Sequence, residues 1–429
     1  MSSTPDIGHS TSVALTAETV AAAQRRTRGV LMAGQVLAGL GMGATLSIGA
    51  ILAAEISGSP AFSGMAATSV TLGAALAAIP LARLARRSGR APALATGALT
   101  AATGATIAMV AAGLSSFPLL LLGILFIGSG TAVNLQSRFA AVDLASPSTR
   151  GRDLSLVVWA TTVGAVSGPN LIGPGETLGA YLGLPDLSGP FLFTIIAQSL
   201  AAVLYLVGLR PDPLAMAAEW RAEQARAARV EEERSGVSAP SAVTAVDDRP
   251  GIRLAMISIA LSHATMVAVM AMTPVHLTAH GASLVIVGFT ISLHIAGMYA
   301  LSPVFGILSD RVGRRATVLM GQGMLVASLL MTGFGAENEA WVVAGLIFLG
   351  LGWSASTVAG SALLTESAAP DRRPIVQGRS DLVMSGSGAL GGALAGVVLA
   401  LLGYNGLSFV ALVLVATVVV ALAVTPRKT

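Results

Sequence analysis

The side chains best suited to ligand chemistry are thioethers and imidazoles in two apolar segments of the second half of the chain. Met266 and Met270 are four residues apart in one segment, and His294 and Met298 are four residues apart in the next. Residues four apart share one face of a helix, and we expect consecutive antiparallel helices to bring the two pairs together. Neutral thioether and imidazole donors suit Cu(I) and bind it weakly enough for release.

The same residues have an ordinary packing interpretation. The chain has 15 methionines, and a histidine in a helix bundle often only hydrogen-bonds across it. Because histidine titrates near neutral pH, His263 and His294 are also candidates for proton coupling.

The elements that must position these side chains are long apolar segments. The 429 residues are 54% hydrophobic and only 11% charged, whereas a soluble domain has about 25% charged residues. This composition argues against a soluble enzyme, a nucleic-acid-binding protein and a disordered regulator. About twelve segments approach the ~20 residues that a helix needs to cross a bilayer, and their unbroken apolar character predicts helices, not a membrane barrel. The predicted spans are residues 30–54, 61–82, 92–114, 117–141, 154–175, 189–209, 252–275, 284–306, 316–335, 340–363, 380–402 and 405–425.

Polar segments divide the chain into two six-helix halves. A cytoplasmic tail (1–28) without the pattern of a signal peptide precedes the first half (29–209), and a linker (210–250) precedes the second (251–429). The first part of the linker is interpreted as an amphipathic helix on the membrane surface or, with preference, as a solvated connection.

The basic residues predict the orientation, because lysine and arginine are retained on the cytoplasmic side. Alternate loops are rich in arginine, and the loops between them carry Glu176, Asp186, Glu337 and Glu339 without lysine or arginine. This pattern predicts a multi-pass protein of the bacterial inner membrane with both termini in the cytoplasm. The cytoplasmic arginines also account for the pI near 10.1 without nucleic acid as a partner. The expected partners are the lipid bilayer and a small substrate.

The two halves resemble each other at regularly spaced glycines. Gly128 and Gly350 are 222 residues apart, as are Gly164 and Gly386, and 224 residues separate Gly89 from Gly313. Several matches at nearly one offset predict a six-helix unit that is used twice, as in many transporters.

One loop carries a specific motif. Residues 306–315 read Gly-Ile-Leu-Ser-Asp-Arg-Val-Gly-Arg-Arg and closely match the G-x-x-x-D-R-x-G-R-R loop of the major facilitator superfamily. A carboxylate beside arginines at a helix end makes charge-assisted bonds that can break and re-form, as a conformational latch requires. The latch residues are Gly306, Asp310, Arg311, Gly313, Arg314 and Arg315.

Two further stretches bear on the same resemblance. In the first-half copy of the loop, Ala82 and Arg86 replace the family's first glycine and its aspartate, so we expect this latch to be weakened or rebuilt. Gly164, Gly168 and Pro169 resemble the family's G-x-x-x-G-P motif, which is frequent in antiporters; simple helix packing explains it equally well.

The chain therefore resembles the major facilitator superfamily over all twelve spans. The resemblance implies an all-α membrane protein of two pseudo-repeated halves that moves a small solute by alternating access, and we expect it to function as a monomer. The Met-x-x-x-Met and His-x-x-x-Met patterns resemble those of the CcoA-like bacterial copper importers, in which the residues matching Met266, Met270, His294 and Met298 handle copper. Copper would then be the substrate, and no cofactor is expected.

An organic solute or drug is the other candidate substrate. The interior is poor in charge, because Asp381 and Arg138 are predicted near inner span ends, which disfavours a carboxylate proton relay and a strongly cationic substrate. Gln35, Asn134 and Asn170 are candidate polar groups of the cavity. A transporter-like sensor or scaffold without flux stays an alternative. An enzyme is not expected, since no nucleophile–base pair is evident by spacing, and the lack of a Walker loop argues against ATP-driven pumping.

Overall fold

The computed structural model describes residues 15–58, 64–168, 171–235, 247–282 and 284–426. These residues form helices and turns, with no strand among them. The first half comprises α1 (Ala17–Ser57), α2 (Gly64–Ser88), α3 (Arg90–Gly113), α4 (Phe117–Ala140), α5 (Arg150–Ser167), α6 (Ile172–Tyr181) and α7 (Pro190–Gly208). The helix α8 (Pro213–Ser235) follows. The second half comprises α9 (Arg249–Ala279), α10 (Leu284–Tyr299), α11 (Ser302–Val312), α12 (Arg314–Phe334), α13 (Glu339–Ser367) and α14 (Arg373–Val424).

The predicted all-α membrane fold is confirmed. Each of the twelve predicted spans lies wholly or largely on a described helix. Among the described residues, nine helical stretches are long and apolar enough to cross a bilayer, and one of them, α14, holds two predicted spans. Its direction changes at Gly403, whose φ of 70° is open to glycine but strained for other residues.

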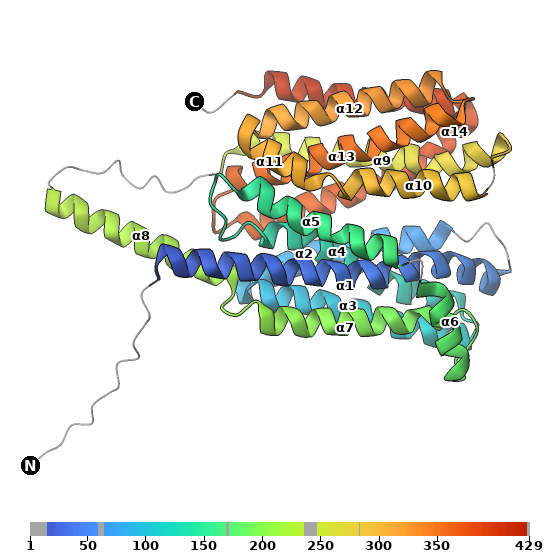
Figure 1. Ribbon diagram of the computed structural model, residues 1–429, viewed down its shortest axis with the longest axis horizontal. Helices are drawn as coiled ribbons and strands as arrows, with labels where there is room; N and C mark the ends of the chain where they lie inside the picture. Colours follow the sequence, from blue (N-terminus) through green and yellow to red (C-terminus); the bar gives the residue numbers. More distant parts are fainter. Residues whose placement is uncertain (1–14, 59–63, 169–170, 236–246, 283, 427–429) are drawn as a thin grey trace, which may run out of the picture.

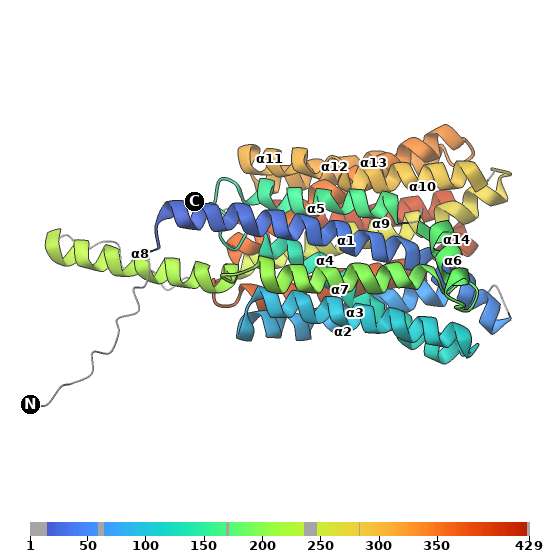
Figure 2. The same cartoon turned by 60° about the horizontal axis from the view of Figure 1, so that its bottom comes forward.

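The helices run side by side in two groups that face each other (Figure 1). The second half, α9 to α14, forms one group, and α1 to α7 form the other; the view in Figure 2 agrees. At one end of the bundle α1 begins, α14 ends and α8 projects outward. We call this the basic end, because the arginine-rich turns between α2 and α3 and between α11 and α12 lie there.

Two spans that were predicted as continuous helices are each divided into two helices. The span 154–175 breaks after Ser167, with Gly168 at the end of α5, and α6 begins at Ile172. The sequence Gly168-Pro169 explains the break, because proline lacks the N–H that continues a helix. The span 284–306 divides at Ala300 and Leu301, and α11 starts with proline in its first turn.

The second half of the predicted tail is helical. The helix α1 begins at Ala17, where the Thr16 hydroxyl accepts a hydrogen bond from the Thr19 N–H at 3.2 Å, and a threonine oxygen stabilises a helix start in this way. The side chain of Gln24 donates to the Ala141 carbonyl at 2.7 Å and to the Asp153 carboxylate at 2.9 Å. The start of α1 is therefore bound to the connection between α4 and α5.

The linker also begins as a helix, although it does not lie flat on the bundle. The first turns of α8 bury Met216 and Ala217, and the rest extends away from the basic end along the bundle axis (Figures 1 and 2). Residues 224–230 are all exposed. The described part is thus a helix whose outer turns are exposed, and both interpretations of the linker, a helix on the membrane surface and a solvated connection, stay predictions.

Candidate functional site

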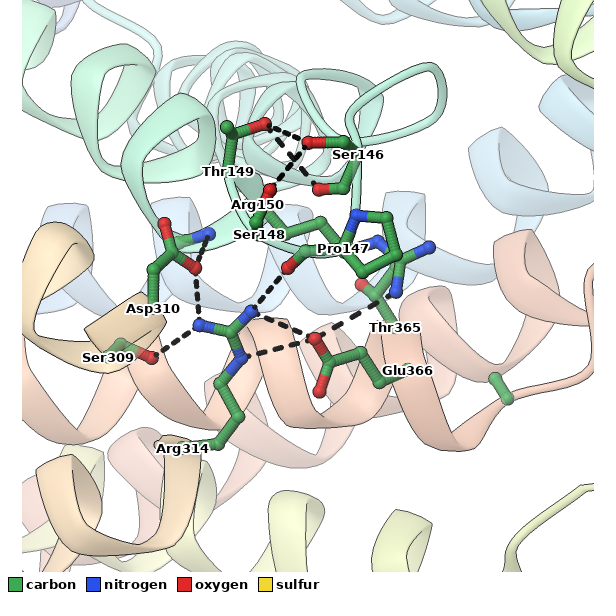
Figure 3. A network of polar contacts seen from close by, with 12 residues as sticks. Ser146, Pro147, Ser148, Thr149, Arg150, Ser309, Asp310, Arg314, Thr365 and Glu366 are labelled. Carbon is green, nitrogen blue, oxygen red and sulfur yellow. Dashed lines mark hydrogen bonds and ion pairs between the residues drawn. The ribbon is translucent and has the colours of Figure 1, made fainter. Parts of the chain in front are cut away.

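The predicted latch joins the two halves at the basic end. The Asp310 carboxylate accepts hydrogen bonds from the backbone N–H groups of Gly151 and Arg152, both at 2.9 Å. These N–H groups belong to the first turn of α5, where a helix has unsatisfied donors and a positive dipole end. A carboxylate on α11 therefore caps a helix of the opposite half (Figure 3).

Arg314 holds this carboxylate in place. Its guanidinium donates to Asp310, to the Glu366 carboxylate at 2.9 Å and to the Pro147 carbonyl at 3.0 Å. Figure 3 shows it between α11, the end of α13 and the loop before α5. The planar fork of arginine suits such a multiple bridge. Removing Arg314 would leave two carboxylates without their main partner.

The other predicted latch residues have different surroundings. At Gly306, a Cβ atom would overlap Ser155 and the Gly151 carbonyl, so glycine permits close contact of α11 with α5. Gly313 has a φ of 99° and directly precedes α12. Arg315 donates to the carbonyl of Thr425 at 2.7 Å, and Arg311 is exposed.

The first-half copy of the latch is rebuilt. Gly89 has a φ of 97°, matching Gly313, and Arg90 takes the place of Arg314. Its buried guanidinium donates to both carboxylate oxygens of Asp143, at 2.7 and 3.1 Å, and to the Gln377 side chain of α14 at 2.8 Å. This copy has lost its aspartate, yet its arginine still links the halves.

The missing first glycine of this copy is compensated on the partner helix. Ala82 replaces it, and its methyl group packs at Gly378 of α14, where a Cβ atom would overlap it. In this contact the glycine is therefore on α14, and no longer on α2.

A buried ion pair, which the sequence analysis missed, also joins the halves. The Arg138 Nη2 of α4 lies 2.6 Å from the Asp381 Oδ1 of α14, with side chains 3% and 0% exposed. The sequence analysis placed both groups near inner span ends but did not pair them. Each is an isolated charge in an apolar segment, and such charges need a partner. This requirement was the feature of the sequence that could have predicted the pair.

Aromatic rings of the second half lie next to this pair. The Trp353 indole N–H donates to the His263 Nδ1 at 3.0 Å, and the Tyr299 ring meets the Trp353 ring edge-on at 5.8 Å between centroids. His263 packs at Gly388 of α14, one helix turn from Met384, whose sulfur lies 3.9 Å from the Arg138 guanidinium. We call these five residues, Arg138, Asp381, His263, Tyr299 and Trp353, the central cluster.

Two atoms of the central cluster have no protein hydrogen bond among the described residues. They are the buried Asp381 Oδ2, an acceptor, and the buried Arg138 Nε, a donor. Buried polar atoms are normally satisfied, so these two unpartnered atoms mark the pair as a candidate ligand contact.

The predicted Met and His residues lie in the interior of the second half. Met266 and Met298 belong to one buried cluster, and Met270 packs against it. His294 is fully buried, and its Nδ1 lies 2.8 Å from the Leu346 carbonyl. A carbonyl only accepts, so Nδ1 carries the hydrogen and the lone pair lies on Nε2; Nε2 has no protein partner in the described chain.

One predicted cavity amide, Gln35, contacts the backbone of another predicted residue, Asn134. The Gln35 side chain donates to the Asn134 backbone carbonyl at 3.0 Å, and the Gln35 Oε1 is buried without a partner among the described residues. Asn170 and Pro169 lie outside the described residues. Gly164 packs α5 against α1, since its Cβ would lie 2.6 Å from the Gly39 Cα, and Gly168 ends α5.

The halves are closed against each other at the basic end. Phe139 of α4 packs with Leu364 and Val376 of the second half. Leu154 of α5 belongs to a cluster with Val358 of α13. The large described clusters toward the opposite end each come from one half alone.

Comparisons with known proteins agree with this architecture. The Major Facilitator Superfamily model matches residues 31–293 and 255–429. The chain is 36% identical to the MFS-type transporter YdeG of Bacillus subtilis (strain 168), over 90% of this chain and 88% of that protein. It is 28% identical to the riboflavin transporter RfnT of Brucella anthropi, over 94% and 96%.

Solved structures share the fold at low identity. The human organic anion transporter MFSD10 (TETRAN) gives a TM-score of 0.73 at 18% identity, covering 93% of this chain and 99% of that chain. FucP in the outward conformation gives 0.67 at 15% identity, covering 94% and 99%. The match of the family model over both halves and the 36% identical relative show that this chain belongs to the major facilitator superfamily of membrane transporters.

Proposed function

We propose that the protein moves a small planar organic solute across the bacterial inner membrane by alternating access and binds it at the central cluster. The observation that carries this proposal is the buried Arg138–Asp381 pair beside three rings, with a free donor and a free acceptor. Aromatic faces stack on planar rings, and a heterocycle presents both acceptors and donors along its edge.

The position of the central cluster between the halves favours this role. Asp381, Met384 and Gly388 follow one face of α14; Arg138 contacts the first two, and His263 packs at the third. A substrate there would contact α4 of one half and α9, α13 and α14 of the other. Separation of the halves would change all of these contacts, as alternating access requires.

The orientation predicted from the arginines assigns the basic end to the cytoplasm, with both termini on that side. The structure would then be closed to the cytoplasm. The relative that carries the name of a riboflavin transporter supports a planar heterocycle as the first substrate to test.

The test is uptake of labelled riboflavin, and of a panel of other planar heterocycles, into proteoliposomes of the purified protein. We expect flux for at least one compound and a loss of at least tenfold in Trp353→Ala and Asp381→Asn. Trp341→Ala is the matched control, because Trp341 lies on the same helix and is 52% exposed. Absence of flux across the panel would overturn the proposal and leave copper transport, or a sensor or scaffold without flux.

Coupling to protons is tested in the same vesicles. His263 and His294 are the candidate groups, and we expect a pH gradient to drive accumulation that the substitution His263→Gln abolishes. Accumulation that is indifferent to the gradient would remove both histidines from this role.

Cu(I) is the second candidate substrate, and one observation favours it. The free lone pair on His294 Nε2 is buried in the second half, where Met266 and Met298 share a cluster. Metal-binding histidines characteristically donate their other N–H to a carbonyl or carboxylate, as His294 does to Leu346. Uptake of labelled copper should fall in His294→Ala and in Met266→Leu, which keeps the volume and removes the thioether. Unchanged uptake in both variants would end this candidate.

A further inference from the structure

A cavity at the basic end lies apart from the central cluster. Its volume is about 610 Å³, and its wall combines the start of α1, the loop between α4 and α5, the first turns of α8 and the start of α14. Small-molecule sites span about 300–1,000 Å³, so this cavity is large enough for a metabolite. It contacts both halves of the bundle.

The wall of this cavity has an excess of positive charge. Its charged side chains are Arg25, Arg28, Arg150, Arg152, Arg221, Arg373, Asp143 and Asp153. Both carboxylates already have arginine partners, because Asp143 binds Arg90 and Asp153 binds Arg28 at 2.7 Å. The arginines are thus not neutralised by the acidic residues among them.

Several guanidinium groups lack an anionic partner. Among the described residues, no carboxylate lies within ion-pair distance of Arg25, Arg221 or Arg373. The Nε atoms of Arg221 and Arg373 donate only to backbone carbonyls, at 2.8 and 3.3 Å. Arg150 has one long ion pair, from its Nη1 to Glu366 at 3.8 Å, and its buried Nε has no partner in the described chain. Like charges are held together here at an electrostatic cost that an anion would remove.

We propose that this cavity binds a phosphate-bearing anion, which bridges Arg150 of the first half, Arg221 of α8 and Arg373 of the second half. Arginine forks match the geometry of phosphate oxygens and bind them through paired charge-assisted hydrogen bonds. An anion in this position ties the two halves together beside the Asp310–Arg314 latch and stabilises the state that is closed at the basic end. The binding itself is independent of the transported substrate.

The binding test is a calorimetric titration of the full chain in detergent with inorganic pyrophosphate. We expect saturable binding that weakens with salt, and a Kd at least tenfold higher in the double variant Arg221→Gln/Arg373→Gln. Arg226→Gln/Arg229→Gln is the charge-matched control, because both residues lie on the exposed part of α8, and its Kd should stay within twofold. Absence of binding, or equal affinity in the cavity variant and the control, would overturn the proposal.

A second measurement reports on closure without requiring transport. The chain has no cysteine, so Ser155→Cys supplies a single thiol at the buried contact of α5 with Gly306. We expect pyrophosphate to slow maleimide labelling of this thiol at least threefold, and to have no effect in the cavity variant. Labelling that neither pyrophosphate nor anionic phospholipid slows would contradict the bridging role.

The phosphate has two possible sources, and the labelling test separates them. Protection by pyrophosphate in nanodiscs of neutral lipid identifies a soluble anion. Protection only in nanodiscs that contain anionic phospholipid identifies a lipid headgroup. Failure of riboflavin or copper transport would leave both readouts unchanged, because neither uses a transported substrate.

Discussion

Arg138 and Asp381 are 243 residues apart in the sequence and 2.6 Å apart in the structure, with both side chains buried between the two halves. This pair connects α4 to α14 next to Trp353, His263 and Tyr299. Because a buried charge is costly without a partner, the pair ties the stability of the closed state to the central cluster.

The first prediction concerns this pair. Arg138→Met or Asp381→Leu leaves one buried charge unpaired, and we expect each single change to lower the free energy of unfolding by about 3–5 kcal/mol. The double variant Arg138→Met/Asp381→Leu should recover most of this loss. Thermal unfolding of the purified variants in detergent measures it. Single variants as stable as the native chain would show that the two charges are not buried together.

The second prediction tests the close contact of α11 with α5. In Gly306→Ala the new methyl group would overlap Ser155 and the Gly151 carbonyl, and overpacking of this kind costs about 1–3 kcal/mol. We expect a lower melting temperature and faster labelling of the thiol in Ser155→Cys. Gly323→Ala is the matched control in α12, since no atom lies within 4 Å of its Cβ position, and it should be neutral or stabilising by up to about 1 kcal/mol. Equal effects of the two changes would contradict this packing.

The third prediction concerns the carboxylate that caps α5. Asp310→Ala removes the acceptor for the N–H groups of Gly151 and Arg152, and loss of a cap costs about 0.5–2 kcal/mol. We expect the Ser155→Cys thiol to become accessible severalfold faster, because Arg314 also loses a partner. Asp310→Asn keeps an acceptor oxygen and should have a smaller effect. The latch role fails if Asp310→Ala labels no faster than the unsubstituted background.

The fourth prediction concerns the rebuilt first-half latch. Arg90→Lys cannot bind both Asp143 oxygens and Gln377 together, because lysine lacks the planar fork. Hydrogen bonds to charged groups contribute about 1.5–3 kcal/mol each, and we expect a loss of stability of that order. Arg87→Lys, on the exposed end of α2, should stay within about 0.5 kcal/mol. Chemical unfolding in detergent compares the two.

The fifth prediction concerns orientation. A membrane-impermeant maleimide applied to whole cells should label Glu337→Cys, which is exposed at the opposite end, and should not label Arg87→Cys at the basic end. Permeabilised cells should show both. Labelling of Arg87→Cys in intact cells would reverse the proposed topology and place the arginine-rich cavity outside.

The sequence by itself determined the membrane helices, the two halves and the family. In an apolar run near the length of a bilayer crossing, the backbone can satisfy its hydrogen bonds only as a helix. The loop Gly306 to Arg315 is specific enough to identify the superfamily. These signals are local, since each is contained in one segment.

Only the tertiary structure decided which distant groups meet. Arg90 binds Gln377, 287 residues away, and Asp310 caps a helix of the other half; neither partner is encoded near its counterpart. The exchange of small residues between Ala82 and Gly378 likewise depends on both helices at once. Contacts between the halves depend on how the two folded helix bundles pack against each other. No pattern within a single segment specifies this packing.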